Sequence, residues 1–401
     1  MAPDLEGTRK SGLSANHVFC FFLFFTAFFR TYRLTSYFTY QDILILFGFI
    51  FVCFLNLDFM RSKVGVFLIL ILLISTLAIA TSSNSVDLFH NYINILKVVQ
   101  CYVLFPFLCL RILQTQSSIK FAILGFLSGA FVSGIIAVKP DQILFSGPEL
   151  RVSGTLGHPV FSGVMFAFAI ILALSSFLTE IQGWKFIRLA LVVFFSIVVI
   201  RTQSGTALLV LGMGFLCWVI LVILSDSKIS TKILFVTSST LALILLNNYL
   251  QGLLIFQRVV FNLTSNRTSS FIPTSAESTL AIRWQTIGYA WDKIRMAPIL
   301  GNGLDLPGQF NLSGMQPHSI FLLAWQTGGV LLLLGSIFLL IDGIDRMAKS
   351  ITNRMIVPLT LFIGTWLTMF TNPFFYDVSF ISAYYLGIFI FRFRIQMQNS
   401  A

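Results

Sequence analysis

Long apolar runs separated by short polar stretches dominate this chain of 401 residues. A helix needs about 20 apolar residues to cross the hydrocarbon core of a bilayer. By that measure the pattern predicts about twelve transmembrane helices, over residues 14–32, 41–57, 64–82, 92–112, 119–138, 159–178, 186–202, 205–225, 231–249, 318–341, 355–371 and 377–393. We therefore expect an all-α integral membrane protein, with nine spans in residues 1–249 and three in residues 318–401.

Residues 250–317 form the one long hydrophilic stretch. Within it, Thr274 and Glu277 match a capping box, in which each side chain satisfies a backbone N–H of the first helical turn. Apolar residues then recur at helical spacing up to Ile294, and Pro298 ends the pattern. The sequence predicts an amphipathic helix over 275–296, which lies along the membrane surface or caps the bundle.

Composition and charge agree with a membrane protein. Apolar residues make up 57% of the chain and charged residues 10%, whereas soluble domains carry about 25% charged residues. The net charge is +11, and more than half of the 26 Lys and Arg residues fall in the loops on the side of the two termini. The positive-inside rule then places both termini in the cytoplasm and the long loop outside. Because orientation accounts for most of the excess charge, no nucleic acid partner is needed.

Five arginines occupy predicted outer loops or the outer ends of spans: Arg151, Arg201, Arg258, Arg267 and Arg283. The planar guanidinium fork suits phosphate oxygens, so several such groups in one cavity would bind a diphosphate. Each of them taken alone is equally explained by snorkelling to the membrane interface. Arg283 differs because it lies within the predicted amphipathic helix, among apolar residues.

Two further residues are candidates for chemistry. Lys97 is the one charged residue well inside a predicted span, where an ionisable group points to function, although a structural ion pair or snorkelling also explains it. His318 follows Pro317 at the start of a predicted span. A histidine at the rim of a membrane cavity can act as a general base near neutral pH, and its alternative role is a structural hydrogen bond.

Motifs for other chemistries are missing from the sequence. No Asp-x-Asp pair and no P-loop is present, and the five cysteines lie in apolar stretches without a Cys-x-x-Cys pair. We therefore expect neither a metal ion nor a cofactor.

Three motifs follow one another between about residues 150 and 335. They are Arg151-Val152-Ser153-Gly154-Thr155 before a span, Arg283 followed by Pro298-Ile299-Leu300-Gly301-Asn302-Gly303, and His318-Ser319 followed after nine residues by Gly329. Their order and spacing resemble the bacterial O-antigen ligase and O-antigen polymerase family. Gly205 stands where that family usually has an arginine, and Arg201 lies one helical turn earlier on the same face. Leu332 departs from the end of the ligase-type motif.

The resemblance implies a metal-independent, inverting glycosyltransferase in the bacterial inner membrane. Its donor would be a glycan on undecaprenyl diphosphate, and transfer would take place at the periplasmic face. His318 would act as the base or orient the acceptor, while Arg283, Arg201 and Arg151 would bind the diphosphate. Arg258, Arg267 and Lys97 are secondary candidates for the same role.

The acceptor leaves two readings open. A lipid-linked repeat unit would make the protein a surface polysaccharide polymerase, with a chain-length regulator protein as a possible partner, and lipid A core would make it an O-antigen ligase. The incomplete ligase-type motif favours the polymerase. A transporter or flippase is the more distant alternative, because no internal repeat is evident and the long loop does not join two equal halves.

Overall fold

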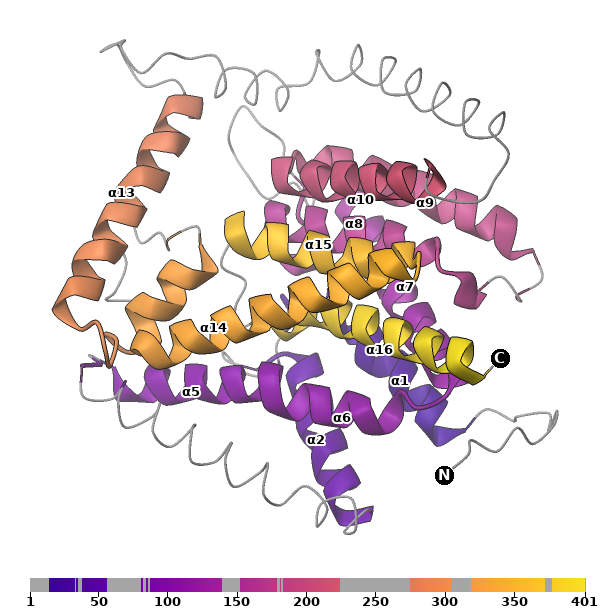
Figure 1. Ribbon diagram of the computed structural model, residues 1–401, viewed down its shortest axis with the longest axis horizontal. Helices are drawn as coiled ribbons and strands as arrows, with labels where there is room; N and C mark the ends of the chain where they lie inside the picture. Colours follow the sequence, from indigo (N-terminus) through magenta and orange to yellow (C-terminus); the bar gives the residue numbers. More distant parts are fainter. Residues whose placement is uncertain are drawn as a thin grey trace.

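The structure, a computed structural model, describes residues 14–55, 81–138, 152–223, 275–304 and 317–400, apart from residues 33, 35–37, 82, 83, 86, 179, 180, 182, 318 and 372–376. These residues form helices and no strand (Figure 1). The α-helices are α1 (Ala15–Phe25), α2 (Tyr40–Leu55), α5 (Leu88–Val99), α6 (Phe105–Ile112), α7 (Gln116–Val138), α8 (Pro159–Ala173), α9 (Trp184–Thr202), α10 (Gly205–Ile223), α13 (Ser275–Met296), α14 (Ile320–Thr352), α15 (Ile356–Thr371) and α16 (Val378–Ser400). One π-helical turn, η2 (Gln100–Leu104), joins α5 to α6 without a break.

Most of the predicted spans coincide with helices. Four described segments are long and apolar enough to cross a membrane: Leu88–Ile112, Gln116–Val138, Ile320–Thr352 and Val378–Asn399. Five shorter apolar helices accompany them. The predicted span over 231–249 and nearly all of that over 64–82 lie outside the described residues. The all-helical membrane class is thus confirmed in outline, whereas the number of spans stays a prediction.

The helices run side by side as a bundle (Figure 1). The starts of α5, α8, α14 and α16 lie toward the same side of the bundle, which we call the site end, and the start of α2 lies against Gln100, just after α5. The charge pattern of the sequence predicts that this end faces outside. α13 occupies the predicted range 275–296 and stands at the site end, steeply inclined to the bundle (Figure 1). The capping residue Thr274 lies outside the described residues.

α14 continues beyond the predicted end of its span at residue 341 and stops at Thr352. Two ion pairs at i,i+4 spacing stabilise the extra turns. Nε of Arg346 lies 2.6 Å from Asp342, and Nζ of Lys349 lies 2.6 Å from Asp345. Such pairs need water, so these turns extend the helix past its apolar part.

α8 is the central helix of the bundle. Every one of its residues except Val160 is buried. It packs against α7, α9, α10, α15 and α16. Gly163 lets the corner between α9 and α10 approach, because a methyl group there would come within 2.6 Å of the Thr202 hydroxyl. The segment that precedes α8 therefore lies at the site end, next to the central helix of the bundle.

α1 and α7 pack closely against each other through two glycines that are four residues apart on α7. A Cβ atom on Gly125 would lie 2.1 Å from the carbonyl oxygen of Phe21, and one on Gly129 would lie 2.4 Å from that of Phe25. Small residues at this spacing allow helix backbones to touch within a membrane, where apolar side chains alone give little preference for one partner. This contact holds the chain after α1 in place at the site end.

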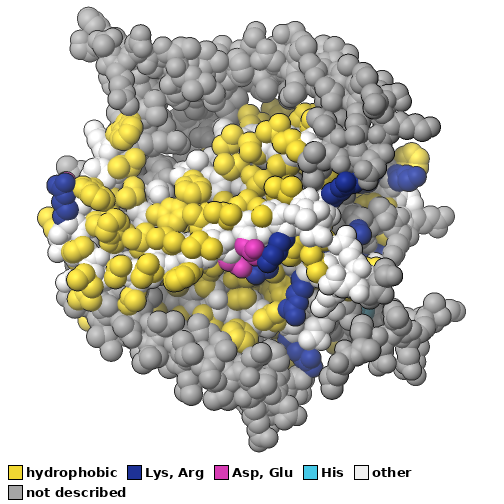
Figure 2. All heavy atoms as spheres, viewed as in Figure 1, with side chains coloured by type: hydrophobic (Ala, Val, Ile, Leu, Met, Phe, Trp, Pro, Cys, Tyr) yellow, Lys and Arg dark blue, Asp and Glu magenta, His cyan; other side chains and the backbone are white. Residues whose placement is uncertain are grey.

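The surface of the bundle is apolar over a broad band. Figure 2 shows hydrophobic side chains across much of one face, with a few acidic and basic side chains near its centre and further basic side chains near its edges. Phe338 on α14 is 68% exposed and Phe47 on α2 is 71% exposed. Exposed apolar surface on this scale is stable against lipid and unfavourable against water.

We expect Gly125→Leu to lower the melting temperature of the purified protein in detergent, because the side chain would push α1 off α7 at a cost of about 1–3 kcal/mol. Gly212→Leu is the matched control, since no atom lies within 4 Å of a Cβ atom at that position. An equal melting temperature for the two variants would contradict the proposed packing role of Gly125.

Candidate functional site

The segment before α8 is tied to α1 and α7 through Thr155. The backbone N–H and the hydroxyl of Thr31 donate hydrogen bonds to the carbonyl oxygen of Thr155, over 3.0 and 2.7 Å. The hydroxyl of Thr155 is hydrogen-bonded to the carbonyl oxygen of Phe28 and to the hydroxyl of Ser133, which lies 2.6 Å away. Gly154 has a φ of 54°, a left-handed conformation that favours glycine. The Gly-Thr pair of the first motif thus anchors this segment.

Arg201 lies beside the same segment, in the last turn of α9. The backbone N–H of Val152 donates a hydrogen bond to the carbonyl oxygen of Arg201, over 3.2 Å. The side chain of Arg201 is exposed. Val152 directly follows Arg151 in the chain. The backbone that follows Arg151 is therefore in contact with the backbone of Arg201. Arg151 itself lies outside the described residues.

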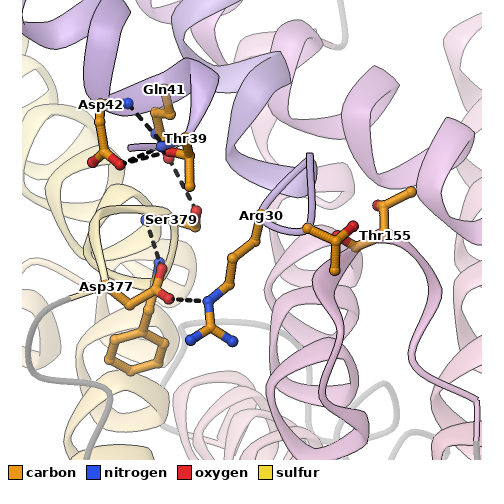
Figure 3. A network of polar contacts seen from close by, with 9 residues as sticks. Arg30, Thr39, Gln41, Asp42, Thr155, Asp377 and Ser379 are labelled. Atoms are coloured by element: carbon orange, nitrogen blue, oxygen red, sulfur yellow. Dashed lines mark hydrogen bonds and ion pairs between the residues drawn. The ribbon is translucent and has the colours of Figure 1, made fainter. Parts of the chain in front are cut away.

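Arg30, which follows α1, forms an ion pair with Asp377 at the start of α16. Its Nε atom lies 2.6 Å from a carboxylate oxygen of Asp377. Its guanidinium carbon lies 4.9 Å from the centre of the Phe161 ring on α8, in a cation–π contact. Figure 3 shows this pair next to Thr155 and the start of α2. Arg30 therefore joins the segment after α1 to α8 and to the start of α16.

A buried polar network continues from Asp377 toward α2. Gln41 is fully buried, donates a hydrogen bond to the hydroxyl of Ser382 over 2.7 Å and accepts one from the hydroxyl of Ser379 over 3.1 Å. Asp42 accepts hydrogen bonds from the N–H and the hydroxyl of Thr39, over 2.7 and 2.9 Å (Figure 3). The network fixes the start of α2 against α16.

Lys97, on α5, is half-buried and lies within electrostatic range of Asp42. One turn later, the side chain of Gln100 donates a hydrogen bond to the carbonyl oxygen of Asp42 over 2.8 Å. The positive charge of Lys97 is thus within electrostatic range of the Asp42 carboxylate, which is compatible with a structural role for this residue.

A second irregular element lies where α14 breaks. Gly329 has φ 62° and ψ −157°, a combination that is open essentially to glycine alone. The break leaves helix carbonyl groups without their usual partners, and the loop after α13 supplies N–H groups to them. The N–H groups of Asn302 and Gly303 donate to the carbonyl oxygens of Gln326 and Thr327, over 2.9 and 3.0 Å. The second and third motifs of the sequence therefore bind one another.

The fit between this loop and α14 leaves no room for side chains at two glycines. A Cβ atom on Gly329 would lie 2.0 Å from the carbonyl oxygen of Ile299, and one on Gly301 would lie 2.3 Å from that of Thr327. The N–H of Val330 donates to the carbonyl oxygen of Ile299 over 3.1 Å. The loop thus replaces part of the missing helical hydrogen bonding of α14.

Amide side chains from α5 hold the other side of the same loop. Asn91 accepts a hydrogen bond from the N–H of Leu304 over 2.6 Å, and Asn94 donates one to the carbonyl oxygen of Leu304 over 2.6 Å. Asn84 donates to the carbonyl oxygen of Gly301 over 2.9 Å. α5, α13 and α14 are therefore connected through one loop at the site end.

Asp87 caps the start of α5. Its carboxylate accepts a hydrogen bond from the N–H of His90 over 3.1 Å and lies 2.6 Å from Nδ1 of the same histidine. The backbone hydrogen bond from His90, followed by the one from its side chain, lowers the pKa of Asp87 below its ordinary value. A lowered carboxyl pKa contributes stability above the ordinary pKa and loses it as the pH falls through the lowered one.

The structure describes only part of the predicted site. Arg201 and Lys97 lie at the site end, as does the backbone that follows Arg151. Arg283 lies on α13, and its side chain is outside what is described. The remaining candidates are also outside the described residues: Arg151, Arg258, Arg267 and His318. Ser319, which follows His318, is the N-cap residue of α14.

Sequence reasoning missed several polar residues of this end. The sequence motifs mark neither Arg30 nor Asp377, which form an ion pair here. The spacing of Asn91, Asn94 and Lys97, three residues apart on one helix face, was a signal that could have marked α5 as facing a polar region. Within the described part of the chain, no three His, Cys, Asp or Glu residues are grouped as metal ligands would be.

The fold and this end of it define a helical membrane protein with a polar, arginine-containing site at one end of the bundle. No protein-family model matches the chain, and no curated protein matches its sequence.

We expect Gly329→Ala to detach the loop from α14, because the new methyl group would overlap the carbonyl oxygen of Ile299. Strain and overpacking together should cost about 1–3 kcal/mol. Hydrogen exchange measured by mass spectrometry should then show faster exchange at residues 297–304. Gly335→Ala on the same helix is the control, since nothing lies within 4 Å of its Cβ position. Unchanged exchange in Gly329→Ala would contradict the docking described above.

Proposed function

We propose that this protein is a metal-independent, inverting glycosyltransferase of the bacterial inner membrane. It would move a glycan from an undecaprenyl-diphosphate donor to a sugar hydroxyl at the periplasmic face, as a polymerase of O-antigen or another surface polysaccharide. The observation that carries the proposal is that the second and third motifs contact each other and that the first motif contacts Arg201. The first motif binds the backbone of Arg201, and the loop of the second binds the Gly329 break of the third.

The chemistry requires two things of such a site. The acceptor hydroxyl attacks the anomeric carbon of the donor sugar, and its proton passes to a base while the bond to the lipid diphosphate breaks. Negative charge then grows on the leaving diphosphate, and preoriented arginines in a poorly hydrated site stabilise it. We assign the base or acceptor-orienting role to His318, and diphosphate binding to Arg283, Arg201 and Arg151, with Arg258, Arg267 and Lys97 as secondary candidates.

The position of His318 in the chain supports its role. It immediately precedes Ser319, the N-cap of α14, and the first half of α14 ends at the break that the 297–304 loop occupies. The C-terminal end of this short half-helix is thereby held by hydrogen bonds to the loop. A base must be kept within hydrogen-bond reach of the acceptor hydroxyl, and we propose that this anchored half-helix helps to position His318.

The acceptor separates polymerase from ligase. A polymerase adds the growing glycan to a lipid-linked repeat unit and can work with a chain-length regulator, whereas an O-antigen ligase adds it to lipid A core. A strain that lacks the gene should show lipopolysaccharide with core plus one repeat if the protein is the polymerase. Bare core with accumulated lipid-linked polymer would instead identify a ligase.

We expect His318→Ala and Arg283→Ala each to lower the transfer rate of the purified protein in detergent by about 100-fold, with a lipid-linked repeat unit as substrate. Arg295→Ala is the matched control, because Arg295 is an exposed arginine on the same helix as Arg283, with its guanidinium 5.8 Å from the Trp291 ring centre. Detergent removes the two compartments that transport needs, so a transporter or flippase would show no transfer at all. Full activity of both variants would refute the site assignment.

A further inference from the structure

The side chain of Arg30 is held in one orientation by contacts on two of its sides. Its Nε atom lies 2.6 Å from a carboxylate oxygen of Asp377 in an ion pair, and its guanidinium carbon lies 4.9 Å from the centre of the Phe161 ring. The backbone next to it is fixed as well, because Thr31 donates two hydrogen bonds to Thr155. An arginine that is fixed in this way loses little conformational entropy when it binds a ligand.

The carboxylate of Asp377 is itself held in place by backbone hydrogen bonds, so it can keep Arg30 in one orientation. The carboxylate oxygen that does not face Arg30 accepts hydrogen bonds from the N–H groups of Ser379 and Phe380, over 3.0 and 3.4 Å. It thus caps the start of α16, where a negative charge is favourable. Its side chain is only 13% exposed, so water competes weakly for these contacts.

Both terminal nitrogens of Arg30 remain available. In a guanidinium they carry about four of the five N–H donors. Among the described residues neither of them has a hydrogen-bond partner, and Figure 3 shows them directed away from Asp377. The side chain is 33% exposed, so these donors are open to a ligand. Their planar fork matches the oxygen atoms of a phosphate group.

The location of Arg30 suggests that its ligand is the diphosphate of the lipid-linked donor. Arg30 contacts Phe161 on α8, and its neighbour Thr31 is hydrogen-bonded to Thr155 of the 152–158 segment. The same segment is hydrogen-bonded to the backbone of Arg201. The charge of Asp377 offsets that of Arg30, so its contribution comes from oriented N–H donors rather than from net charge. Such N–H donors can bind one oxygen atom of a phosphate group. Other arginines would then neutralise the rest of the phosphate charge.

We infer that Arg30 binds the diphosphate of the lipid-linked donor and that Asp377 is its positioning residue. This inference rests on the proposed function and adds to it a binding residue from the segment after α1, outside all three motifs. Arg30 touches the substrate in this arrangement, whereas Asp377 acts only through Arg30.

The test is direct binding of undecaprenyl diphosphate to the full-length protein in detergent, with undecaprenol as the uncharged comparison. We expect Arg30→Gln to weaken diphosphate binding by about tenfold or more, the loss expected for charge-assisted hydrogen bonds. Arg30→Lys should recover only a small part of the affinity, because it keeps the charge but loses the oriented fork of N–H donors. Binding of undecaprenol should stay unchanged in both variants.

Asp377→Asn tests the positioning role. It should weaken diphosphate binding less than Arg30→Gln does, and the double variant should bind no more weakly than Arg30→Gln alone, because Asp377 acts through Arg30. Arg346→Gln is the matched control. It breaks an equally short arginine–aspartate pair, which lies in the last turns of α14, away from the site end.

A measurement on the unaltered protein covers the case in which the variants do not fold. Phenylglyoxal modifies guanidinium groups, and bound undecaprenyl diphosphate should slow its reaction with Arg30, as followed by mass spectrometry. If the wild-type protein binds the diphosphate without protecting Arg30, or if Arg30→Gln binds it equally well, the inference is wrong and the proposed function stands. If the wild-type protein binds no undecaprenyl diphosphate, the proposed function fails first and the inference with it.

Discussion

A backbone that leaves the helical path within an apolar bundle must find partners for its N–H and carbonyl groups, because lipid offers none. The site end of this protein is built around that requirement. At Gly329, α14 loses its regular hydrogen bonding, and the loop after α13 supplies the missing donors from Asn302 and Gly303. The segment before α8 is satisfied in the same way, by Thr31 and by the carbonyl group of Arg201.

These two irregular elements need a rigid frame, and the central helices provide it. α8 is buried along nearly its whole length, so its start has a single position at the site end. α1 is pressed against α7 through Gly125 and Gly129, which leaves Arg30 next to Asp377. Close backbone contact and buried hydrogen bonds, rather than the apolar effect alone, choose among the many ways in which apolar helices could pack in lipid.

The polar groups at this end suit the recognition of an anion. Carboxylates accompany two of the cations that the structure describes there: Asp377 pairs with Arg30, and Asp42 lies near Lys97. Such pairing lowers the cost of keeping the charges in a partly buried site and leaves oriented donors in place. A leaving diphosphate is stabilised most by donors that are already oriented before the reaction, which is the reason for our functional proposal.

The sequence by itself determined the class of the fold and the approximate ranges of most described helices, because apolar run length follows directly from bilayer thickness. It also predicted the range of α13, whose alternation of polar and apolar residues has a helical period. It did not predict that α14 would continue to Thr352. The prediction followed the length of the apolar run, and the ion pairs that stabilise the last turns lie after that run ends. It recognised the motif ending in Gly329 without showing that this glycine breaks a helix.

Only the tertiary structure decided which distant residues meet. Arg30 and Asp377 are separated by almost the whole chain, and nothing in the pattern around either residue identifies the other. The same holds for Asn91 and Leu304, and for Val152 and Arg201. Helix periodicity reports which face of a helix is apolar, and it is silent about which neighbour covers that face. Pairing at the site end depends on helix order within the bundle, and that order is set by close contacts such as those of Gly125 and Gly163.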